Sequence, residues 1–324
     1  MASRPIVFVS RSLPPAGINL LNTECDVRVW PTDSNITRQG MLDGVRGGVD
    51  AIVCHPPDKV DTEVLDLAGY KLKVIGTMSV GLEHLDLPEI RKRGIKVGYT
   101  PNVLTDATAE MTMALLLATS RRLQEGFSAV HEGGWGTWGG GMYLCGKQIT
   151  GSVVGIVGLG RIGLAVAMRL QPFGVSQFLY SGNSAKPWAS DVNAKFVKFD
   201  TLLQQSDFVI ACCSMNAQNK GLFNKDAFSK MKDSAIFINT SRGVLVNQED
   251  LYDALKSGKI LAAGLDVATP EPLPKDHPLK TLKNCVITPH LGSATTQARN
   301  LMAELTAKNV LAGLKGEALP SPVP

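Results

Sequence analysis

The first hundred residues alternate between short apolar runs and longer stretches in which apolar side chains recur every three or four positions. The stretches DTEVLDLAGY and HLDLPEIRKRG have this helical spacing, and Gly94 marks the end of the second. Short buried strands that alternate with helices predict a parallel α/β sheet. The expected strands are residues 6–10, 51–55, 73–77 and 95–99.

Residues 105–123, TDATAEMTMALLLATSRRL, predict one long helix. Thr105 or Asp106 can cap its first turn, and two arginines near its end suit a helix C-terminus. The segment is apolar on nearly every face, so we expect it to be buried between larger pieces of the protein.

A second α/β series follows and begins with the apolar run VVGIVG. Asn247 is expected to cap one of its helices, NQEDLYDALKSG, and Gly258 to end it. Two α/β series predict two domains, with a substrate cleft between them. The expected strands are residues 153–158, 177–180, 208–213, 235–239, 261–267 and 285–289, and the last helix covers residues 294–313.

The run VVGIVG leads into a G-x-G-x-x-G turn and then a helix, which is the setting of a dinucleotide-binding fingerprint. Gly158 permits the tight turn, Gly160 lets the backbone approach a pyrophosphate, and Gly163 allows close helix–sheet packing. A purely structural turn is the alternative, because the motif also occurs by chance. The N–H groups expected to face the phosphates are those of Leu159, Arg161 and Ile162.

The end of the next strand bears on the choice of cofactor. NAD-specific sites normally carry Asp or Glu there, which bonds the adenine ribose. This chain has no carboxylate from Ser181 to Lys186, whereas hydroxyls, an amide and a lysine are suited to a 2′-phosphate. The pattern favours NADP; the alternative is that Ser181 bonds a ribose hydroxyl and both cofactors bind. The expected cofactor contacts here are Ser181, Gly182, Asn183 and Ser184.

Three later residues carry chemistry at or just beyond the carboxyl ends of expected strands, where α/β sheets place ligands. Arg242 suits bidentate capture of a carboxylate. Glu271 lies between two prolines, and His290 follows the last strand. Histidine is the usual general acid or base near neutral pH, and a carboxylate partner orients it. Spacing alone leaves open whether Glu271 contacts His290, and a surface arginine or a structural histidine are the alternatives.

Composition excludes several other classes. The chain has 324 residues, 44% hydrophobic content and a net charge of +4 without a Lys/Arg block, which argues for two soluble domains and against a nucleic-acid surface. Six cysteines without a C-x-x-C pair, and no His/Cys cluster, predict neither disulfides nor a metal site. No apolar run is long enough for a signal peptide or a bilayer span, so we expect a cytoplasmic protein without a membrane partner.

Five motifs follow one another along the chain: SVGLEHLD, GLGRIG, NTSRG, the GLDV…EP loop and PHLGSAT. Their order and spacing are those of the D-isomer-specific 2-hydroxyacid dehydrogenases, and the chain resembles this family over nearly its whole length. Stretches such as RKRGIKVGYTPNVLTDATAE most resemble the animal-type glyoxylate/hydroxypyruvate reductases within it. The resemblance implies a Rossmann domain, residues 107–295, inserted into a flavodoxin-like substrate domain made of residues 1–106 and 296–324.

The resemblance also implies roles for matching positions. Arg242 binds the substrate carboxylate and keto oxygen, and His290 donates the proton in reduction with Glu271 as its partner. The N–H groups of Val80 and Gly81 grip the carboxylate from the first domain. Further contacts are expected from Asp266 to the nicotinamide carboxamide, from Ser293 to the substrate, and from Ser214, Thr240 and Gly292 to the cofactor.

Two departures from the family pattern concern the cofactor. The turn CCSMNAQN lacks a proline that many relatives have, and Asn183 stands where an arginine would strengthen the case for NADP. The expected activity is NADPH-dependent reduction of short 2-keto acids, glyoxylate to glycolate and hydroxypyruvate to D-glycerate. The alternatives are a phosphoglycerate or other D-2-hydroxyacid dehydrogenase and, from another class, a dinucleotide-sensing binding module like the family's corepressors.

We also expect a homodimer, since the resemblance implies one. Residues 133–141, GGWGTWGGG, predict a loop with two tryptophans. These aromatics are placed either to contact another subunit or domain, or to pack on their own domain.

Overall fold

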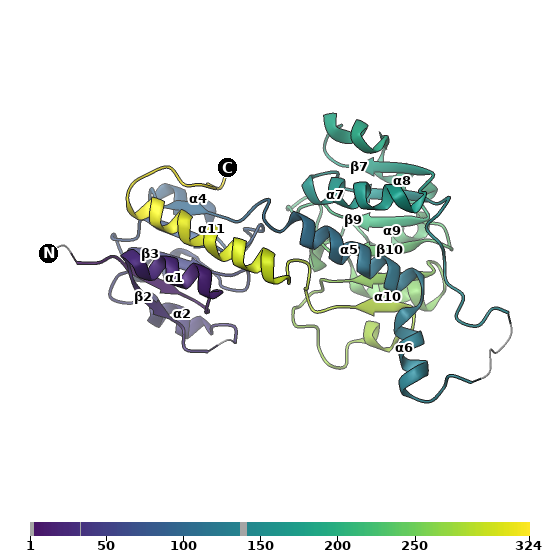
Figure 1. Cartoon of the computed structure of the whole chain (residues 1–324), viewed down its shortest axis with the longest axis horizontal. Helices are drawn as coiled ribbons and strands as arrows, with labels where there is room; N and C mark the ends of the chain where they lie inside the picture. The colour runs from purple at the N-terminus through teal and green to yellow at the C-terminus, as the bar shows by residue number, and fades with distance from the viewer. Residues whose placement is uncertain (1–2, 33, 137–140) are drawn as a thin grey trace. The chain divides into compact units, whose positions relative to one another are not determined.

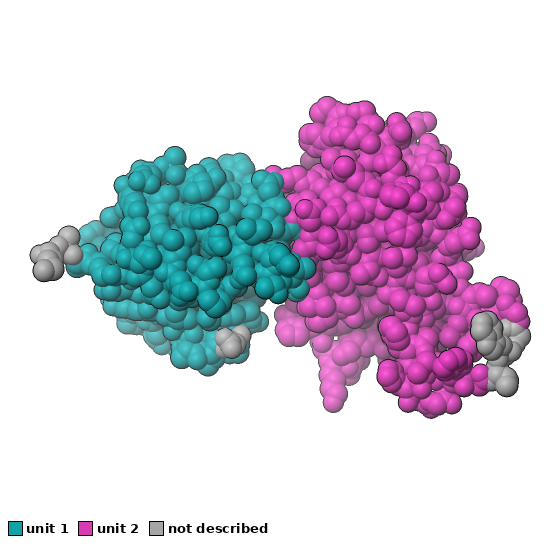
Figure 2. Space-filling view, in the orientation of Figure 1, with its two compact units in different colours: residues 1–104, 294–324 teal, residues 105–293 magenta. Residues whose placement is uncertain are grey.

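The computed structural model describes residues 3–32, 34–136 and 141–324. The chain forms two compact units (Figure 2): unit 1 is Met1–Leu104 with Ala294–Pro324, and unit 2 is Thr105–Ser293. Unit 2 is therefore an insertion in the sequence of unit 1. The expected boundaries, at residues 106/107 and 295/296, lie two residues further along the chain.

Unit 1 is built on a five-stranded parallel sheet in the order β2-β1-β3-β4-β5, which is the flavodoxin-like order. The expected strands are present with ends shifted by at most one residue, and β2 is an addition. Its sequence, DVRV, is mostly exposed, so it lacks the apolar run that marks a buried strand. The strands are β1 (Ile6–Val9), β2 (Asp26–Val29), β3 (Ala51–Cys54), β4 (Val74–Thr77) and β5 (Lys96–Gly98).

Helices cover this sheet in two layers. The last helix, α11 (Thr296–Leu314), packs on α1 (Pro15–Glu24) and on strands β3, β4 and β5 (Figure 1). The contact is close, because a Cβ at Gly76 of β4 would lie 2.8 Å from Val310 of α11. Apolar residues of the other helices form a separate core: α2 (Arg38–Val45), α3 (Thr62–Ala68) and α4 (Leu87–Lys92).

Unit 2 is built on a seven-stranded parallel sheet in the order β12-β11-β10-β9-β6-β7-β8. Counted from β6, this is the 3-2-1-4-5-6 order of a Rossmann fold with one further strand. Both units therefore confirm the doubly wound fold expected from the sequence. The strands are β6 (Val153–Val157), β7 (Gln177–Ser181), β8 (Ala194–Phe196), β9 (Phe208–Ala211), β10 (Ile236–Asn239), β11 (Ala262–Leu265) and β12 (Cys285–Ile287).

The helices of unit 2 bury two separate apolar cores, one on each face of the sheet. On one face lie α5 (Thr105–Ser120) and α7 (Arg161–Leu170). On the other lie α8 (Phe199–Gln205), α9 (Lys225–Lys230) and α10 (Gln248–Lys256). As predicted, Asn247 caps α10, where its side chain accepts hydrogen bonds from the second and third N–H groups of the helix.

The prediction of a single helix over residues 105–123 is wrong at its C-terminal bound. Helix α5 stops at Ser120, and a second helix, α6 (Leu123–His131), starts after a break. Arg122 lies in the left-handed region at φ 54°, which an α-helix cannot contain. The apolar period continues across the break, so periodicity gave no sign of it. Among the described residues, no helix is long and apolar enough to cross a membrane.

Candidate active site

The three glycines of the turn after β6 differ in what the fold requires of them. Gly158 has φ 98°, and a Cβ there would lie 2.6 Å from the backbone of Cys213. A Cβ at Gly163 would lie 2.3 Å from the carbonyl oxygen of Gly158. At Gly160, by contrast, a Cβ would meet no heavy atom within 4 Å. The fold therefore needs the first and third glycines, while the space in front of the second is open.

Helix α7 presents uncapped N–H groups to this open space. Gly160 is its N-cap and offers no side-chain acceptor, and the first turn holds no acidic residue. The first N–H groups of a helix have no intrahelical partner, and the helix dipole favours an anion there. An open backbone and unpaired donors fit the pyrophosphate of a dinucleotide. The N–H groups of Arg161 and Ile162 belong to this first turn, and that of Leu159 precedes it.

The end of β7 is tied to the glycine turn. The carbonyl of Ser181 accepts a hydrogen bond from the Gly158 N–H at 2.8 Å. Further along, the indole Nε1 of Trp188 donates to the carbonyl of Leu159 at 2.8 Å. Between these two contacts lies the segment without a carboxylate, in which Lys186 Nζ lies 3.2 Å from Ser184 Oγ. Sequence reasoning missed Trp188, because it lies outside every motif.

A buried asparagine shapes the turn that carries Arg242. Asn239 ends β10, and its side chain accepts from the Ser241 N–H at 3.0 Å and donates to the Arg242 carbonyl at 2.9 Å. The residue after Arg242 must be glycine, because a Cβ at Gly243 would lie 2.0 Å from the Ala268 carbonyl oxygen. Arg242 is half-buried. Sequence reasoning treated Asn239 only as part of a strand, although the NTSRG motif contained it.

The structure brings Glu271 and His290 together, which spacing could not show. The Nδ1 atom of His290 lies 2.7 Å from Oε2 of Glu271. The other carboxylate oxygen accepts from the Ala268 N–H at 2.9 Å. Burial by itself raises the pKa of Glu271, but hydrogen bonds from His290 and Ala268 and the charges of His290 and Arg242 outweigh it, so the pKa lies below its usual value. Glu271 is therefore an anion next to the imidazole.

Asp266 holds the loop that carries His290. Its carboxylate is buried and accepts from the Thr288 hydroxyl at 2.6 Å, the Leu291 N–H at 2.8 Å and the Gly292 N–H at 2.8 Å. The His290 N–H donates to the Asp266 carbonyl at 2.9 Å. This bracing role was not among the expectations for Asp266, whose contact with the nicotinamide remains a prediction.

A second bracing residue was also missed. The Gln248 side chain donates to the Thr269 carbonyl at 2.6 Å and accepts from the Thr269 N–H at 2.8 Å, which fixes the loop leading to Glu271. Of the other expected residues, Thr240 is buried, with its hydroxyl 2.7 Å from that of Thr112 on α5. Ser214 is exposed, Ser293 is half-buried, and Val80 and Gly81 are half-buried residues of unit 1.

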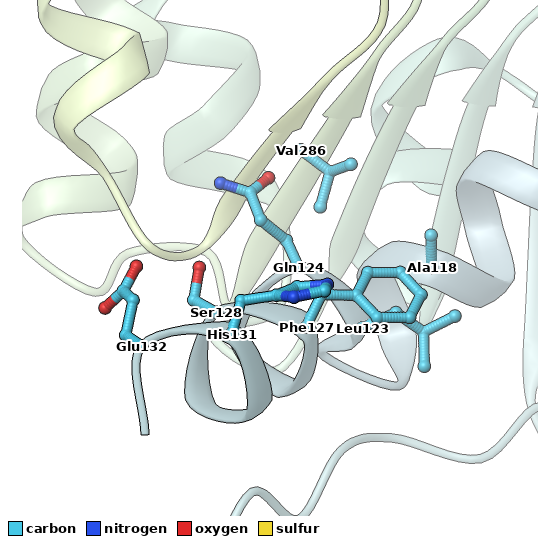
Figure 3. A pocket seen from close by; sticks show the side chains of 8 residues that line it. All are labelled: Ala118, Leu123, Gln124, Phe127, Ser128, His131, Glu132 and Val286. Atoms are coloured by element: carbon cyan, nitrogen blue, oxygen red, sulfur yellow. The ribbon is translucent and has the colours of Figure 1, made fainter. Parts of the chain in front are cut away.

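Unit 2 also has a pocket of about 330 Å³ (Figure 3). Most of its lining comes from α6, including Leu123, Phe127 and His131, and it contains none of the strand-end residues described above. No group of His, Cys, Asp and Glu side chains among the described residues is arranged to hold a metal ion. The convergent polar groups at the ends of β10, β11 and β12 are therefore the candidate active site.

Comparison with known proteins decides the family. Residues 113–292 match the model of the D-isomer specific 2-hydroxyacid dehydrogenase NAD-binding domain. The chain belongs to this family. It is an NAD(P)-dependent dehydrogenase, as the glycine turn and the strand-end residues predicted.

Family members similar to this chain include full-length enzymes. The human protein named glyoxylate reductase/hydroxypyruvate reductase is 54% identical over 97% of this chain and 96% of its own length. A Thermus thermophilus structure has a TM-score of 0.91 at 40% identity, covering 98% of this chain and all of the other. An NADPH-dependent glyoxylate/hydroxypyruvate reductase of Sinorhizobium meliloti, solved with NADP and malonate, has a TM-score of 0.85 at 29% identity over 99% of this chain and 97% of its own.

Proposed function

We propose that this dehydrogenase reduces the short 2-keto acids glyoxylate and hydroxypyruvate to the corresponding 2-hydroxy acids, with NADPH as its cofactor. The observation that carries the proposal is the convergence of Arg242, Glu271 and His290 beyond the ends of three neighbouring strands. Human and mouse proteins with this named activity are each 54% identical to the chain over nearly its whole length.

Arg242 is the substrate anchor in this proposal. A guanidinium binds a carboxylate through two parallel hydrogen bonds, and its charge also stabilises negative charge that develops on a keto oxygen. Asn239 and Gly243 fix the turn that presents it. The N–H groups of Val80 and Gly81 in unit 1 are assigned to the same carboxylate.

His290 donates the proton to the developing alkoxide. The Glu271 carboxylate at Nδ1 orients the ring, which leaves Nε2 to act on the substrate. The Asp266 carboxylate holds the loop in which the ring is presented. Ser293, three residues after the histidine, is assigned a contact with the substrate.

Unit 2 is assigned to the cofactor. When bound, the nicotinamide supplies the hydride that reduces C2 of the keto acid. The uncapped start of α7 and the open space at Gly160 are suited to its pyrophosphate. The preference for NADPH rests on the segment after β7, where Lys186 and Ser184 lie together and no carboxylate would repel a 2′-phosphate. The proposed cofactor contacts are Gly158, Leu159, Gly160, Arg161, Ile162, Gly163, Ser181, Gly182, Asn183, Ser184, Ser214, Thr240, Asp266 and Gly292.

We further propose that the protein acts as a homodimer. Helix α6 buries none of its residues, although Leu123, Phe127 and Val130 are large and apolar. Trp135, in the loop that follows, is 67% exposed. Exposed apolar side chains gathered on one segment are typical of a protein–protein interface. The other tryptophan of the expected loop, Trp138, lies outside the described residues.

The test is a panel of steady-state assays with glyoxylate, hydroxypyruvate and pyruvate, each with NADPH and with NADH. We expect turnover of the first two substrates and a higher kcat/KM with NADPH. A higher kcat/KM with NADH would overturn the cofactor preference, and no turnover of any 2-keto acid would favour a dinucleotide-sensing binding module.

The variant Arg242→Ala tests the assigned anchor in the same assays. We expect kcat/KM for glyoxylate to fall by about 10²-fold or more, on the scale of a lost charge-assisted contact and lost transition-state stabilisation. The Kd for NADPH, measured by fluorescence titration, should change little. Loss of NADPH binding would show instead that Arg242 serves the cofactor.

A further inference from the structure

A line of hydrogen-bonded side chains lies behind the loop that follows β4 in unit 1. The Nε2 atom of His84 lies 2.9 Å from Oγ1 of Thr77, and that hydroxyl lies 2.7 Å from Oγ of Ser79. The Ser79 hydroxyl donates to the carbonyl oxygen of Gly81 at 2.7 Å. All three side chains belong to buried residues. The line therefore joins a buried histidine to the backbone of the loop.

Each hydroxyl has a single proton, and this determines which group donates in each hydrogen bond of the line. A carbonyl only accepts, so the single hydroxyl proton of Ser79 goes to Gly81. Ser79 must then accept from Thr77, which uses the single hydroxyl proton of Thr77. Thr77 must in turn accept from His84, so the Nε2 atom of His84 carries a proton. Along this line, each of the four groups thus has one compatible role.

The backbone of the loop is also held at both ends. The Ser79 carbonyl accepts from the Thr100 N–H at 2.9 Å, and the His84 carbonyl accepts from the Val60 N–H at 2.9 Å. Between these anchors, the N–H groups of Val80 and Gly81 donate to no acceptor within the described part of the chain. Hydrogen bonds thus hold the loop in place, while the N–H groups of Val80 and Gly81 stay available to a ligand.

We propose that His84, Thr77 and Ser79 are positioning residues, which hold Gly81 so that the two N–H groups are ready for the substrate carboxylate. Glycine has the greatest backbone freedom, and a hydrogen bond that holds the Gly81 carbonyl reduces that freedom. Fixing the donors before binding lowers the entropy lost when the carboxylate is bound. The inference rests on the proposed function, in which these N–H groups bind that carboxylate.

Thr77→Val removes the central hydroxyl with little change of shape. We expect KM for glyoxylate to rise about tenfold, which corresponds to about 1.4 kcal/mol. The value of kcat should stay within about twofold, because a carboxylate contact is made equally in the ground and transition states. Thr77→Ser keeps the hydroxyl and should restore KM. Ser79→Ala, which breaks the last link to Gly81, should raise KM like Thr77→Val and serves if that variant does not fold.

Thr100→Val is the matched control. Thr100 is fully buried beside the same loop, but its hydroxyl has no hydrogen-bond partner within the described residues. Replacing it should leave KM and kcat unchanged. Equal KM values for Thr77→Val, Thr77→Ser and the wild type would overturn the inference, as would an equal rise in KM for Thr100→Val.

Binding of oxamate, a non-reacting relative of short 2-keto acids, separates this inference from the proposed function. Calorimetry on the complex with NADPH should show weaker oxamate binding for Thr77→Val than for the wild type, with unchanged binding of NADPH. A wild-type protein that binds oxamate without reducing any keto acid would overturn the proposed function alone. Equal oxamate affinity in the two proteins, or no oxamate binding by the wild type, would overturn the inference.

Discussion

His290 adopts a backbone conformation that is uncommon for any residue other than glycine. Its φ of 56° lies in the left-handed region, and the residues that follow it donate two N–H groups to the carboxylate of Asp266. Such conformations cost free energy and persist where surrounding contacts over-determine them. The buried aspartate thus keeps the loop in the form in which the imidazole meets Glu271.

At the residue scale, Glu271→Gln replaces the charged partner of His290 by a neutral one of similar shape. We expect kcat/KM for glyoxylate reduction to fall by on the order of 10²-fold near neutral pH, the scale of general acid–base effects. The measurement is kcat/KM near neutral pH.

The same substitution has a consequence for stability. Because the pKa of Glu271 is lower in the folded protein than in the unfolded chain, its carboxylate stabilises the fold above the unfolded pKa of about 4.3. That contribution is lost as pH falls through the folded pKa. The difference in Tm between the wild type and Glu271→Gln should therefore be present at pH 6 and shrink below about pH 4.3.

Glu89→Gln is the control for the kinetic measurement. It breaks the ion pair between Glu89 on α4 and Arg93 just after that helix, whose side chains lie 2.9 Å apart. We expect unchanged activity from this variant. If the two glutamates affect kcat/KM equally, Glu271 has no special part in the reaction.

At the element scale, the three glycines of the turn between β6 and α7 serve different purposes: two are needed for the fold, and one is suited to binding. Gly158 and Gly163 are required by backbone conformation and packing, whereas Gly160 has an extended backbone that any residue adopts and open space beyond its Cα. Only an incoming pyrophosphate gives a reason for glycine at that position.

Gly160→Ala should therefore impair binding without impairing the fold. We expect Tm to change by no more than ~2 °C, since a Cβ meets no heavy atom within 4 Å. The Kd for NADPH should rise at least about tenfold, because the methyl group occupies the approach of the phosphates. Differential scanning fluorimetry and fluorescence titration measure the two quantities.

Two further glycines provide the comparison. Gly126→Ala adds a methyl group to an equally open position on α6 and should leave the Kd unchanged. Gly163→Ala should lower Tm, because its Cβ would lie 2.3 Å from the Gly158 oxygen. An unchanged Kd for Gly160→Ala would contradict the proposal that the glycine turn and the start of α7 bind the pyrophosphate.

At the scale of the whole molecule, the two units share one principle of construction. Each is a doubly wound parallel sheet, and in each the proposed ligand-binding groups lie beyond the carboxyl ends of strands, where open α/β sheets place ligands. The chain returns to unit 1 at Ala294. Helix α11 then completes this unit by packing on α1 and on the sheet. The insertion of unit 2 therefore leaves each core intact.

Phe127→Lys tests the proposed dimer. Phe127 lies on the apolar face of α6 and is 62% exposed in the single chain, so a lysine fits the fold but opposes burial against a second copy. We expect light scattering to give about twice the chain mass of 34.6 kDa for the wild type and the monomer mass for the variant. Tyr70→Lys, at another exposed aromatic residue in unit 1, should leave the dimer unchanged. A monomeric wild type, or a dimeric Phe127→Lys, would contradict the proposal.

The sequence by itself determined the two parallel sheets, the place of the glycine turn and the three residues that we propose carry the chemistry. These depend on local signals, because buried strands are short apolar runs and catalytic groups follow their ends. The missed strands β2 and β8 lie at sheet edges, where exposed and partly buried residues weaken the apolar pattern.

Only the tertiary structure decided which side chains meet. Strand order brings Glu271 to His290 across nineteen positions, and it assigns Asp266 and Asn239 to brace the turns beside them. The structure also has a helix break at Arg122, and it links His84 to Gly81 through the hydroxyls of Thr77 and Ser79. Periodicity reports burial along one element, whereas these contacts depend on left-handed turns and on neighbours that are distant in the chain.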